Sequence, residues 1–153
     1  MTIRPARPDE LDLLSSLALR SKGHWGYSPE FLEACRQELT VTPDRLSSEW
    51  IRVYEADSGV VGYVAVVVEG EQAGLVDLFV DPDRIGSGAG RALWEEAVEW
   101  ACSRGAVRLR IEADPNAEAW YRNRGAVPVG WAPSGSIPGR MLPVLELDLT
   151  SLV

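Results

Sequence analysis

The stretch DPDRIGSGAGRAL, residues 81–93, decides how this chain is interpreted. Three glycines stand at alternate positions in it, namely Gly86, Gly88 and Gly90. The apolar run LVDLFV, residues 75–80, comes before them and predicts a strand. The run RALWEEAVEWACSRG, residues 91–105, follows with the spacing of an amphipathic helix. The glycines therefore mark a junction between a strand and a helix.

This junction predicts an anion-binding cradle at residues 86–91, with a glycine-rich surface turn as the alternative. Backbone N–H groups at a helix start have no intrahelical acceptor, and the helix dipole adds partial positive charge. Alternate residues without Cβ let a phosphate or diphosphate come close. A Walker A loop is excluded because Arg91-Ala92 follow the last glycine instead of Lys-Ser/Thr. Glu112 stands about where a dinucleotide fold needs its ribose carboxylate, but too little chain follows for that sheet.

Composition fits one globular domain spanning residues 1–153. The formal net charge of −8 argues against nucleic acid or an anionic membrane surface as a partner. Among the basic residues, Lys22 is the only lysine. No stretch approaches the roughly 18 to 20 apolar residues of a membrane span, and no signal peptide is apparent. Cys35 and Cys102 lie in helical patterns without metal-ligand spacing, so we expect free thiols, no metal and a cytoplasmic setting.

Hydrophobic periodicity predicts a mixed α/β chain in which most strands run antiparallel. Strands are predicted at residues 2–6, 50–56, 60–69, 75–80, 107–113, 126–131 and 144–149. Helices are predicted at residues 8–22, 28–39, 91–105 and 115–124, with a short helical turn at 42–50. The helix at 91–105 makes the strand at 107–113 run parallel to the strand at 75–80. A long loop, APSGSIPGRMLP, is predicted at residues 132–143.

The run LFVDPDRIGSGAGRAL resembles the acyl-CoA-binding motif of the GNAT N-acetyltransferases. In that motif a strand and a proline are followed by R/Q-x-x-G-x-G/A, which opens a long helix. Gly88 and Gly90 match the two family glycines, and Ile85 stands at the R/Q position. The run ADPNAEAWYRNRGA resembles the second signature of the family, with Asn116 and Tyr121 in the usual order. The resemblance implies the GNAT fold, an α+β sheet of about seven strands with one parallel pair splayed to admit acyl-CoA.

The resemblance also implies acetyl-CoA as co-substrate, bound by two groups of residues. The diphosphate would lie on residues 86–91, and a backbone N–H from the strand residues at 78–80 would polarise the thioester carbonyl. The residues expected to contact the co-substrate are Leu78, Phe79, Val80, Gly86, Ser87, Gly88, Ala89, Gly90, Arg91, Asn116 and Tyr121. Asn116 also suits a local helix cap, which is the alternative for that residue.

Transfer of an acyl group to an amine needs an acid for the leaving thiolate, and a base that takes a proton from the ammonium because an ammonium cannot attack. The resemblance assigns the acid to Tyr121, for which core packing is the alternative. Glu112 and Asp77 are the candidate bases because both lie on strands beside the expected cleft. A water chain in place of a base, and ordinary ion pairs for both carboxylates, are the alternatives.

The acceptor site is predicted from two loops that flank the expected cleft. The first loop, HWGYS, contributes His24, Trp25 and Tyr27, and the second, PSGSIPGR, contributes Ser134, Ser136 and Arg140. Arg140 suits a substrate carboxylate, and both serines supply hydrogen bonds. The alternatives are a structural histidine, packed tryptophans and an exposed arginine.

The sequence therefore predicts an N-acyltransferase that moves an acetyl group from acetyl-CoA to a small or amino-acid-like primary amine. Peptide N-termini and protein lysines stay open as acceptors, and the acidic surface favours a cationic one. The alternative is a GNAT-like module that binds acyl-CoA without turnover. A homodimer is an expectation from the resemblance alone.

Overall fold

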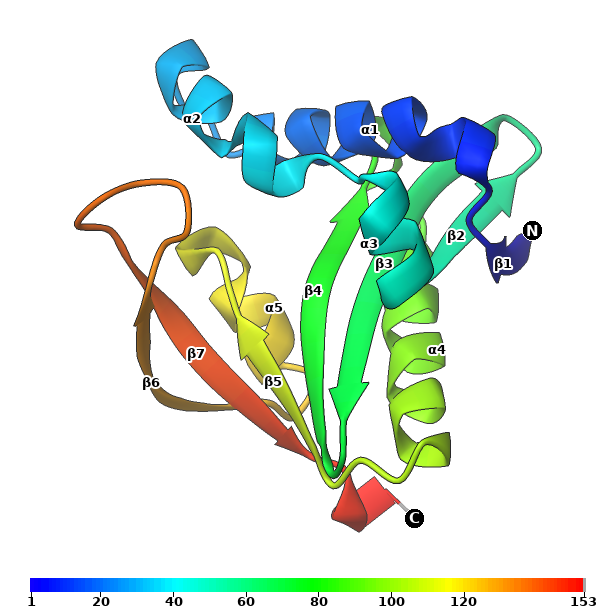
Figure 1. Ribbon diagram of the computed structural model, residues 1–153, viewed down its shortest axis with the longest axis vertical. Coiled ribbons are helices and arrows are strands. Elements are labelled where there is room, and N and C mark those ends of the chain that lie inside the picture. The colour runs from blue at the N-terminus through cyan, green and yellow to red at the C-terminus, as the bar shows by residue number, and fades with distance from the viewer. Residues whose placement is uncertain (153) are drawn as a thin grey trace.

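A computed structural model describes residues 1–152 of the chain as helices around one seven-stranded sheet, in the order β1-β2-β3-β4-β5-β7-β6 (Figure 1). The strands are β1 (Thr2–Pro5), β2 (Trp50–Ala56), β3 (Gly59–Glu69), β4 (Gln72–Val80), β5 (Arg108–Glu112), β6 (Val127–Pro133) and β7 (Met141–Asp148). The α-helices are α1 (Leu11–Gly23), α2 (Pro29–Leu39), α3 (Pro43–Ser48), α4 (Ala89–Ser103) and α5 (Glu118–Arg122). Short 3₁₀ turns cover Pro8–Glu10, Pro82–Arg84, Pro115–Ala117 and Thr150–Leu152.

Local sequence sets where the first helices begin. The Ser28 hydroxyl accepts a hydrogen bond from the Phe31 N–H at the start of α2, and Pro29 occupies the first helical position. Thr42 caps α3 in the same way through the Arg45 N–H. Both starts match the sequence-based prediction. The predicted helix at residues 8–22 instead opens with a 3₁₀ turn before α1.

The parallel pair confirms the predicted topology and also shows where the sheet opens. β4 pairs with β5 only from Gln72↔Arg108 to Leu75↔Ile111. On the other side, β4 pairs with β3 in register Ala65↔Asp77 and then Val66↔Leu75, so Val76 is a bulged residue. The pairing with β5 therefore ends just before the bulge. Figure 1 shows the two strands diverging from there as the arms of a V.

Two apolar cores cover the two faces of the sheet, as the alternation of β3 requires. Val64 and Val66 pack in a core with Leu93 and Trp94 of α4. Tyr63 and Ala65, on the opposite face, pack in a core with α1 and α2. The two cores hold β3 and β4 rigidly beside the open part of the sheet.

Two predicted boundaries are wrong. β4 begins at Gln72 rather than at residue 75, because Glu69 pairs with Gln72 across a two-residue turn that Gly70 makes possible at φ +60°. The loop predicted at residues 132–143 covers only residues 134–140, since β6 and β7 pair as far as Pro133↔Met141. Prolines at both strand ends gave that segment the composition of a longer loop.

Candidate active site

The glycine loop between β4 and α4 holds free backbone donors. Gly86 and Gly88 adopt φ values of +87° and +92°, a region in which an L-residue is strained, and Gly88 is the N-cap of α4. A Cβ at either position would meet no heavy atom within 4 Å, so both glycines face open space. Gly90 has an ordinary φ, and its missing Cβ leaves room beside Val80 and Trp120.

Within residues 1–152, several amides of this loop have no hydrogen-bond acceptor. They are the N–H groups of Gly86, Gly88, Gly90 and Arg91. The Ser87 N–H donates to the Arg84 carbonyl at 3.1 Å, and the Ala89 N–H donates to the Ser87 hydroxyl at 3.4 Å. Free amides at the start of a 15-residue helix form a site for an anion.

A cavity of about 400 Å³ runs from this loop along the open side of β4. Its walls are mainly apolar, and they include Leu78 and Val80 of the strand together with Trp120. Asn116 lies at its rim, where its side-chain amide donates to Asp114 and to the Tyr27 hydroxyl, each at 3.0 Å. Eight of the eleven predicted co-substrate residues therefore line one cavity. Ser87 and Ala89 lie in the glycine loop without lining it, and Phe79, whose ring packs on Tyr63, lines a different cavity instead.

Tyr121 lies where this cavity meets a second one. Its side chain is 7% exposed and packs against Trp94 and Trp120 at ring distances of 5.7 and 5.2 Å. Its hydroxyl has no hydrogen-bond partner among residues 1–152. Burial raises the pKa of Tyr121 well above its usual value, and the charges of Asp77 and Asp114 add to the effect. The hydroxyl is therefore a protonated donor at neutral pH.

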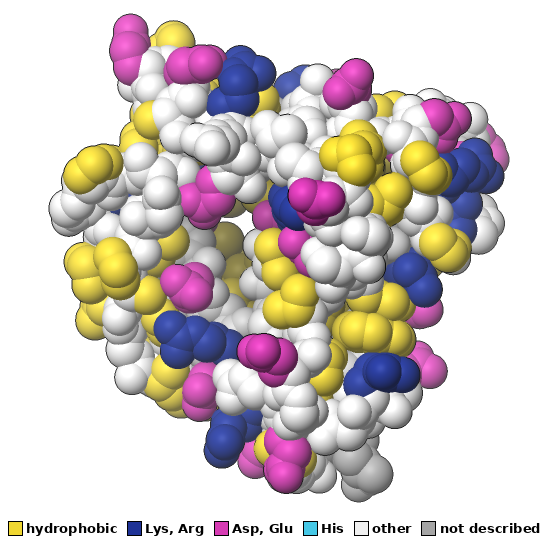
Figure 2. All heavy atoms as spheres, in the orientation of Figure 1, with side chains coloured by type: hydrophobic (Ala, Val, Ile, Leu, Met, Phe, Trp, Pro, Cys, Tyr) yellow, Lys and Arg dark blue, Asp and Glu magenta, His cyan; other side chains and the backbone are white. Residues whose placement is uncertain are grey.

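The second cavity, of about 180 Å³, lies in the gap between β4 and β5. Tyr121, Trp25, Leu78, Ala117 and Ser21 line both cavities, so the two are continuous. Its lining holds four carboxylates, namely Glu38, Asp77, Glu112 and Asp114. Figure 2 shows the gap as a hollow in the surface with acidic side chains around it.

Asp77 and Glu112, the two predicted bases, have different surroundings. Asp77 is 7% exposed and accepts hydrogen bonds from Arg45 at 2.6 Å and from the Tyr63 hydroxyl at 3.0 Å. Burial raises the pKa of Asp77, while Arg45 and Tyr63 oppose the shift. Glu112 has a half-exposed side chain whose nearest cation, Arg110, is 3.8 Å away. Only Glu112 combines a lining position with a carboxylate that has no strong partner among the described residues.

The loop residues predicted for the acceptor site form a hydrogen-bond network at the end of this second cavity. The Tyr27 hydroxyl donates to Asp114 and accepts from Arg140 at 2.7 Å. Lys22 forms an ion pair with Asp114 at 3.0 Å. Burial alone would raise the pKa of Asp114, but the Asn116 N–H and the Lys22 charge lower it overall. The guanidinium of Arg140 is thus held by residues of the protein itself.

Of the remaining loop residues, His24 and Trp25 line a cavity, whereas Ser134 and Ser136 line neither of the two. His24 and Trp25 line the glycine cavity, with their rings 5.1 Å apart edge to face. The Ser136 hydroxyl donates to Glu38 of α2 at 2.7 Å, which ties the loop between β6 and β7 to that helix. The Ser134 hydroxyl instead accepts the N–H groups of Ser136 and Ile137, which shape the loop. The roles of all these side chains stay predictions.

Sequence reasoning missed Glu38, Asp114, Lys22, Trp120 and Arg124, all of which line a cavity. Trp120 and Arg124 stand next to the second signature, so their position alone was a usable signal. Glu38 contacts Ser136, 98 residues away in the chain, and Asp114 contacts Tyr27, 87 residues away. Neither contact could be predicted from neighbouring residues.

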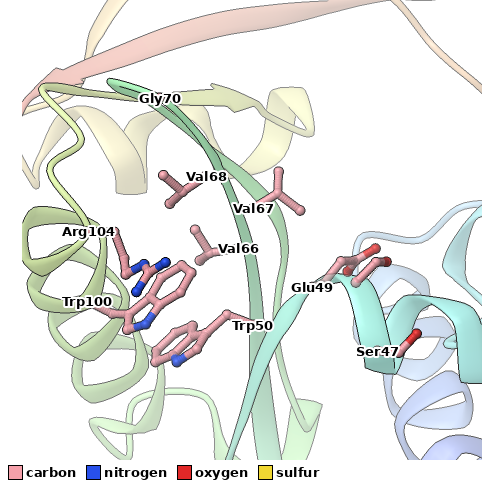
Figure 3. A pocket seen from close by; sticks show the side chains of 10 residues that line it. Ser47, Glu49, Trp50, Val66, Val67, Val68, Gly70, Trp100 and Arg104 are labelled. Carbon is pink, nitrogen blue, oxygen red and sulfur yellow. The ribbon is translucent and has the colours of Figure 1, made fainter.

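Another hollow, of about 450 Å³, lies beyond the far end of α4 (Figure 3). It is lined by the stacked rings of Trp50 and Trp100, 4.7 Å apart, and by Arg104 and Glu49. It contains none of the predicted site residues. The length of α4 separates it from the glycine loop by roughly 20 Å, because an α-helix rises about 1.5 Å per residue. This hollow is therefore separate from the predicted site.

Two searches for other features complete the description of residues 1–152. No helix in this part of the chain has the length and apolarity that a membrane span requires. The described residues also contain no cluster of three or more His, Cys, Asp or Glu side chains arranged to hold a metal ion.

A splayed parallel pair and a glycine loop with free amides at the start of α4 agree with the acyl-CoA-binding fold that the sequence resembles. The family model described as "Acetyltransferase (GNAT) family" matches residues 14–126. The chain therefore belongs to the GNAT acetyltransferase family, and its fold is the GNAT fold, as the sequence predicted. No curated protein matches the chain in a sequence search.

Solved structures share the fold over nearly the whole chain. A GCN5-related N-acetyltransferase from Rhodopseudomonas palustris is 23% identical with a TM-score of 0.79, covering 96% of this chain and 94% of its own. The PaiA N-acetyltransferase of Thermoplasma acidophilum, in complex with coenzyme A, is 19% identical with a TM-score of 0.76, covering 96% and 98%. The ribosomal-protein-S18-alanine N-acetyltransferase of Escherichia coli is 20% identical with a TM-score of 0.71, covering 97% and 93%.

Proposed function

We propose that the chain transfers an acetyl group from acetyl-CoA to the primary amine of a small, cationic acceptor, by direct attack while both substrates are bound. The observation that carries this proposal is the Tyr121 hydroxyl. Tyr121 is a buried residue that lines both cavities, and its hydroxyl has no hydrogen-bond partner among residues 1–152. The structure of the PaiA N-acetyltransferase from T. acidophilum contains coenzyme A, which supports acetyl-CoA as the acetyl donor.

The glycine cavity is proposed to hold the coenzyme. The free amides at residues 86–91 suit the diphosphate, and the apolar walls formed by Leu78 and Val80 suit the pantetheine arm. Beyond Leu75, the β5-facing side of β4 has no strand partner. A backbone N–H there can donate to the thioester carbonyl, and loss of such a donor typically costs about 3 to 4 kcal/mol of transition-state stabilisation.

The chemistry moves protons on both substrates. The bound ammonium first gives one proton to Glu112, directly or through water, because this carboxylate lines the cavity between β4 and β5 without a strong partner. The neutral amine nitrogen then forms a bond to the carbonyl carbon, the carbon–sulfur bond breaks, and the thiolate takes the Tyr121 proton. The second nitrogen proton, lost as the amide forms, restores the Tyr121 hydroxyl through water, and Glu112 releases its proton to solvent. Asp77 is committed to Arg45 and Tyr63, so we assign it to holding α3 against β4 and not to proton transfer.

The acceptor is proposed to enter the cavity between β4 and β5 as a cation. Glu38 and Glu112 line that cavity and have no ion-pair partner closer than 3.8 Å among the described residues. Lys22 and Arg140 share the single carboxylate of Asp114, so this group keeps one positive charge, which the free carboxylates of Glu38 and Glu112 outnumber. An ammonium group is therefore favoured there over a carboxylate.

An amine panel with a thiol-release readout tests the proposal, with acetyl-CoA binding measured in parallel by calorimetry. We expect release of coenzyme A with diamines or other cationic amines, and little with amino acids that carry an extra carboxylate. Acetyl-CoA binding with every amine class inert would replace the enzyme by a non-catalytic acyl-CoA sensor. Absence of binding would remove both readings.

A further inference from the structure

Arg124, the residue before the Gly125 turn, places a cation beside the glycine loop. Its guanidinium carbon lies 4.2 Å from the ring centroid of Trp120. The Trp120 ring, in turn, lies 3.8 Å from the point where a Cβ on Gly90 would stand. Both side chains line the glycine cavity. The Trp120 ring thus lies between the Arg124 guanidinium and the glycine loop that carries the free amides.

The charge of Arg124 is uncompensated within residues 1–152. No carboxylate of the described residues lies within 4 Å of it, and its buried Nε has no hydrogen-bond acceptor. The two other arginines of this cavity have partners, since Arg84 donates to Ser58 and Arg91 pairs with Glu95. A partly buried guanidinium without an acceptor is costly, and an aromatic face compensates it only in part. An anion from outside the protein supplies the missing partner.

We propose that Arg124, held flat on Trp120, is a phosphate-binding side chain for the nucleotide part of the coenzyme. A planar guanidinium matches two phosphate oxygens at once, and its stacking on an indole fixes the direction of the fork. The site thereby extends the backbone cradle with a charged side chain from a different element. This inference rests on the proposed coenzyme and concerns the residue that recognises its charge.

Two phosphate groups of coenzyme A have the required chemistry, the diphosphate and the ribose 3′-phosphate. Calorimetric titration with coenzyme A and with dephospho-coenzyme A, which lacks the 3′-phosphate, distinguishes them. For Arg124→Gln we expect coenzyme A affinity to fall about 10- to 100-fold, because one charge-assisted contact is lost. If dephospho-coenzyme A keeps its affinity in this variant, the partner is the 3′-phosphate. If both ligands weaken equally, it is the diphosphate.

Arg122→Gln is the matched control. Arg122 lies two residues away, is exposed, pairs with Glu118 at 3.9 Å and does not line the cavity, so its loss should leave affinity unchanged. Arg124→Lys keeps the positive charge but loses the two-pronged guanidinium, so its coenzyme A affinity should lie between those of the wild type and Arg124→Gln. This second variant keeps the inference testable if Arg124→Gln folds poorly. Wild-type affinity within twofold in both Arg124 variants would overturn the inference while leaving the proposed function intact. A wild-type protein that binds no coenzyme A would overturn the proposed function first.

Discussion

The two cavities that meet at Tyr121 are built in opposite ways. The glycine cavity takes its donors from one continuous loop and its other wall from the segment at residues 116–124. The acceptor cavity takes its polar groups from α1, α2, β4 and β5 and is closed by hydrogen bonds between residues 87 to 113 positions apart. The proposed coenzyme site therefore relies mainly on local backbone geometry, whereas the proposed acceptor site relies on side chains that the fold assembles from distant segments.

Removal of the Tyr121 hydroxyl, which lies where the two cavities meet, should have the largest effect on turnover. Tyr121→Phe removes only a hydroxyl that has no protein partner, so folding and acetyl-CoA affinity should be nearly unchanged. Loss of the acid should lower kcat about 10²- to 10⁴-fold. Steady-state kinetics and calorimetry measure both quantities, with Tyr54→Phe on β2 as a control outside both cavities. Full turnover by Tyr121→Phe would remove the acid role and leave water as the proton donor.

The glycine cavity should be disturbed selectively by a single methyl group. Gly88 and Gly59 both have positive φ, +92° and +112°, and both lack neighbours for an added Cβ. Alanine should therefore strain both sites similarly, by about 1 to 2 kcal/mol. Only Gly88 lines the cavity, so only Gly88→Ala should also weaken coenzyme A, about tenfold or more, in a calorimetric titration. Equal affinities in the two variants would contradict the cradle.

The hydrogen-bond network of the acceptor side should show itself through pH. The pKa of Asp114 is lowered below 3.8 in the folded protein. Its stabilising contribution is therefore complete above the unfolded pKa and is lost as pH falls through the lower folded value. Asp114→Asn should reduce the free energy of unfolding by about 1 to 2 kcal/mol at pH 7, and the difference should shrink toward pH 2 to 3.

Denaturant titrations at several pH values measure this difference. Asp148→Asn is the comparison variant, because the lowered pKa of Asp148 comes mainly from its hydrogen bonds to Thr150, which lie outside the two cavities. A gap between wild type and Asp114→Asn that stays constant down to pH 2 would show that the carboxylate charge is not what stabilises the network.

The smallest effect is expected from the charge of the acceptor cavity. Glu38→Gln keeps the hydrogen bond from Ser136 and removes one charge. We expect kcat/KM for a diamine to fall about fivefold, with no change for a neutral monoamine ester and none in coenzyme A affinity. Competition assays with the two amines in one reaction give the ratio directly. An equal loss for both amines would point to loop position and not to charge.

What the sequence predicts well is what depends on neighbouring residues. The alternate glycines gave the cradle, the capping serine and proline gave α2, and the strand–helix–strand order gave the parallel pair. The position of Tyr121 came from the second signature, although its burial and its free hydroxyl needed the fold.

What the sequence could not give depends on contacts across the chain. Arg140 looked like a free binding residue, but its guanidinium meets Tyr27, 113 positions away. Asp77 looked like any strand carboxylate until α3 brought Arg45 to it. The start of β4 was missed because a two-residue turn and a longer loop share the same residue types at positions 69–74. Tertiary contacts decide the surroundings of Arg140 and Asp77, whereas local strand pairing decides the start of β4.

The ion pair between Lys22 and Asp114 has a consequence for handling a protein that is proposed to use a reactive thioester. Lys22 is the only side-chain amine in the sequence, its side chain is 14% exposed, and its nitrogen is 3.0 Å from a carboxylate. A side-chain nitrogen that is mostly buried and engaged by a carboxylate is poorly accessible to an acyl group. Incubation with excess acetyl-CoA should therefore leave the lysine side chain unmodified, so that self-acylation does not obscure the assay and amine-directed labelling at this position reports loosening of the network.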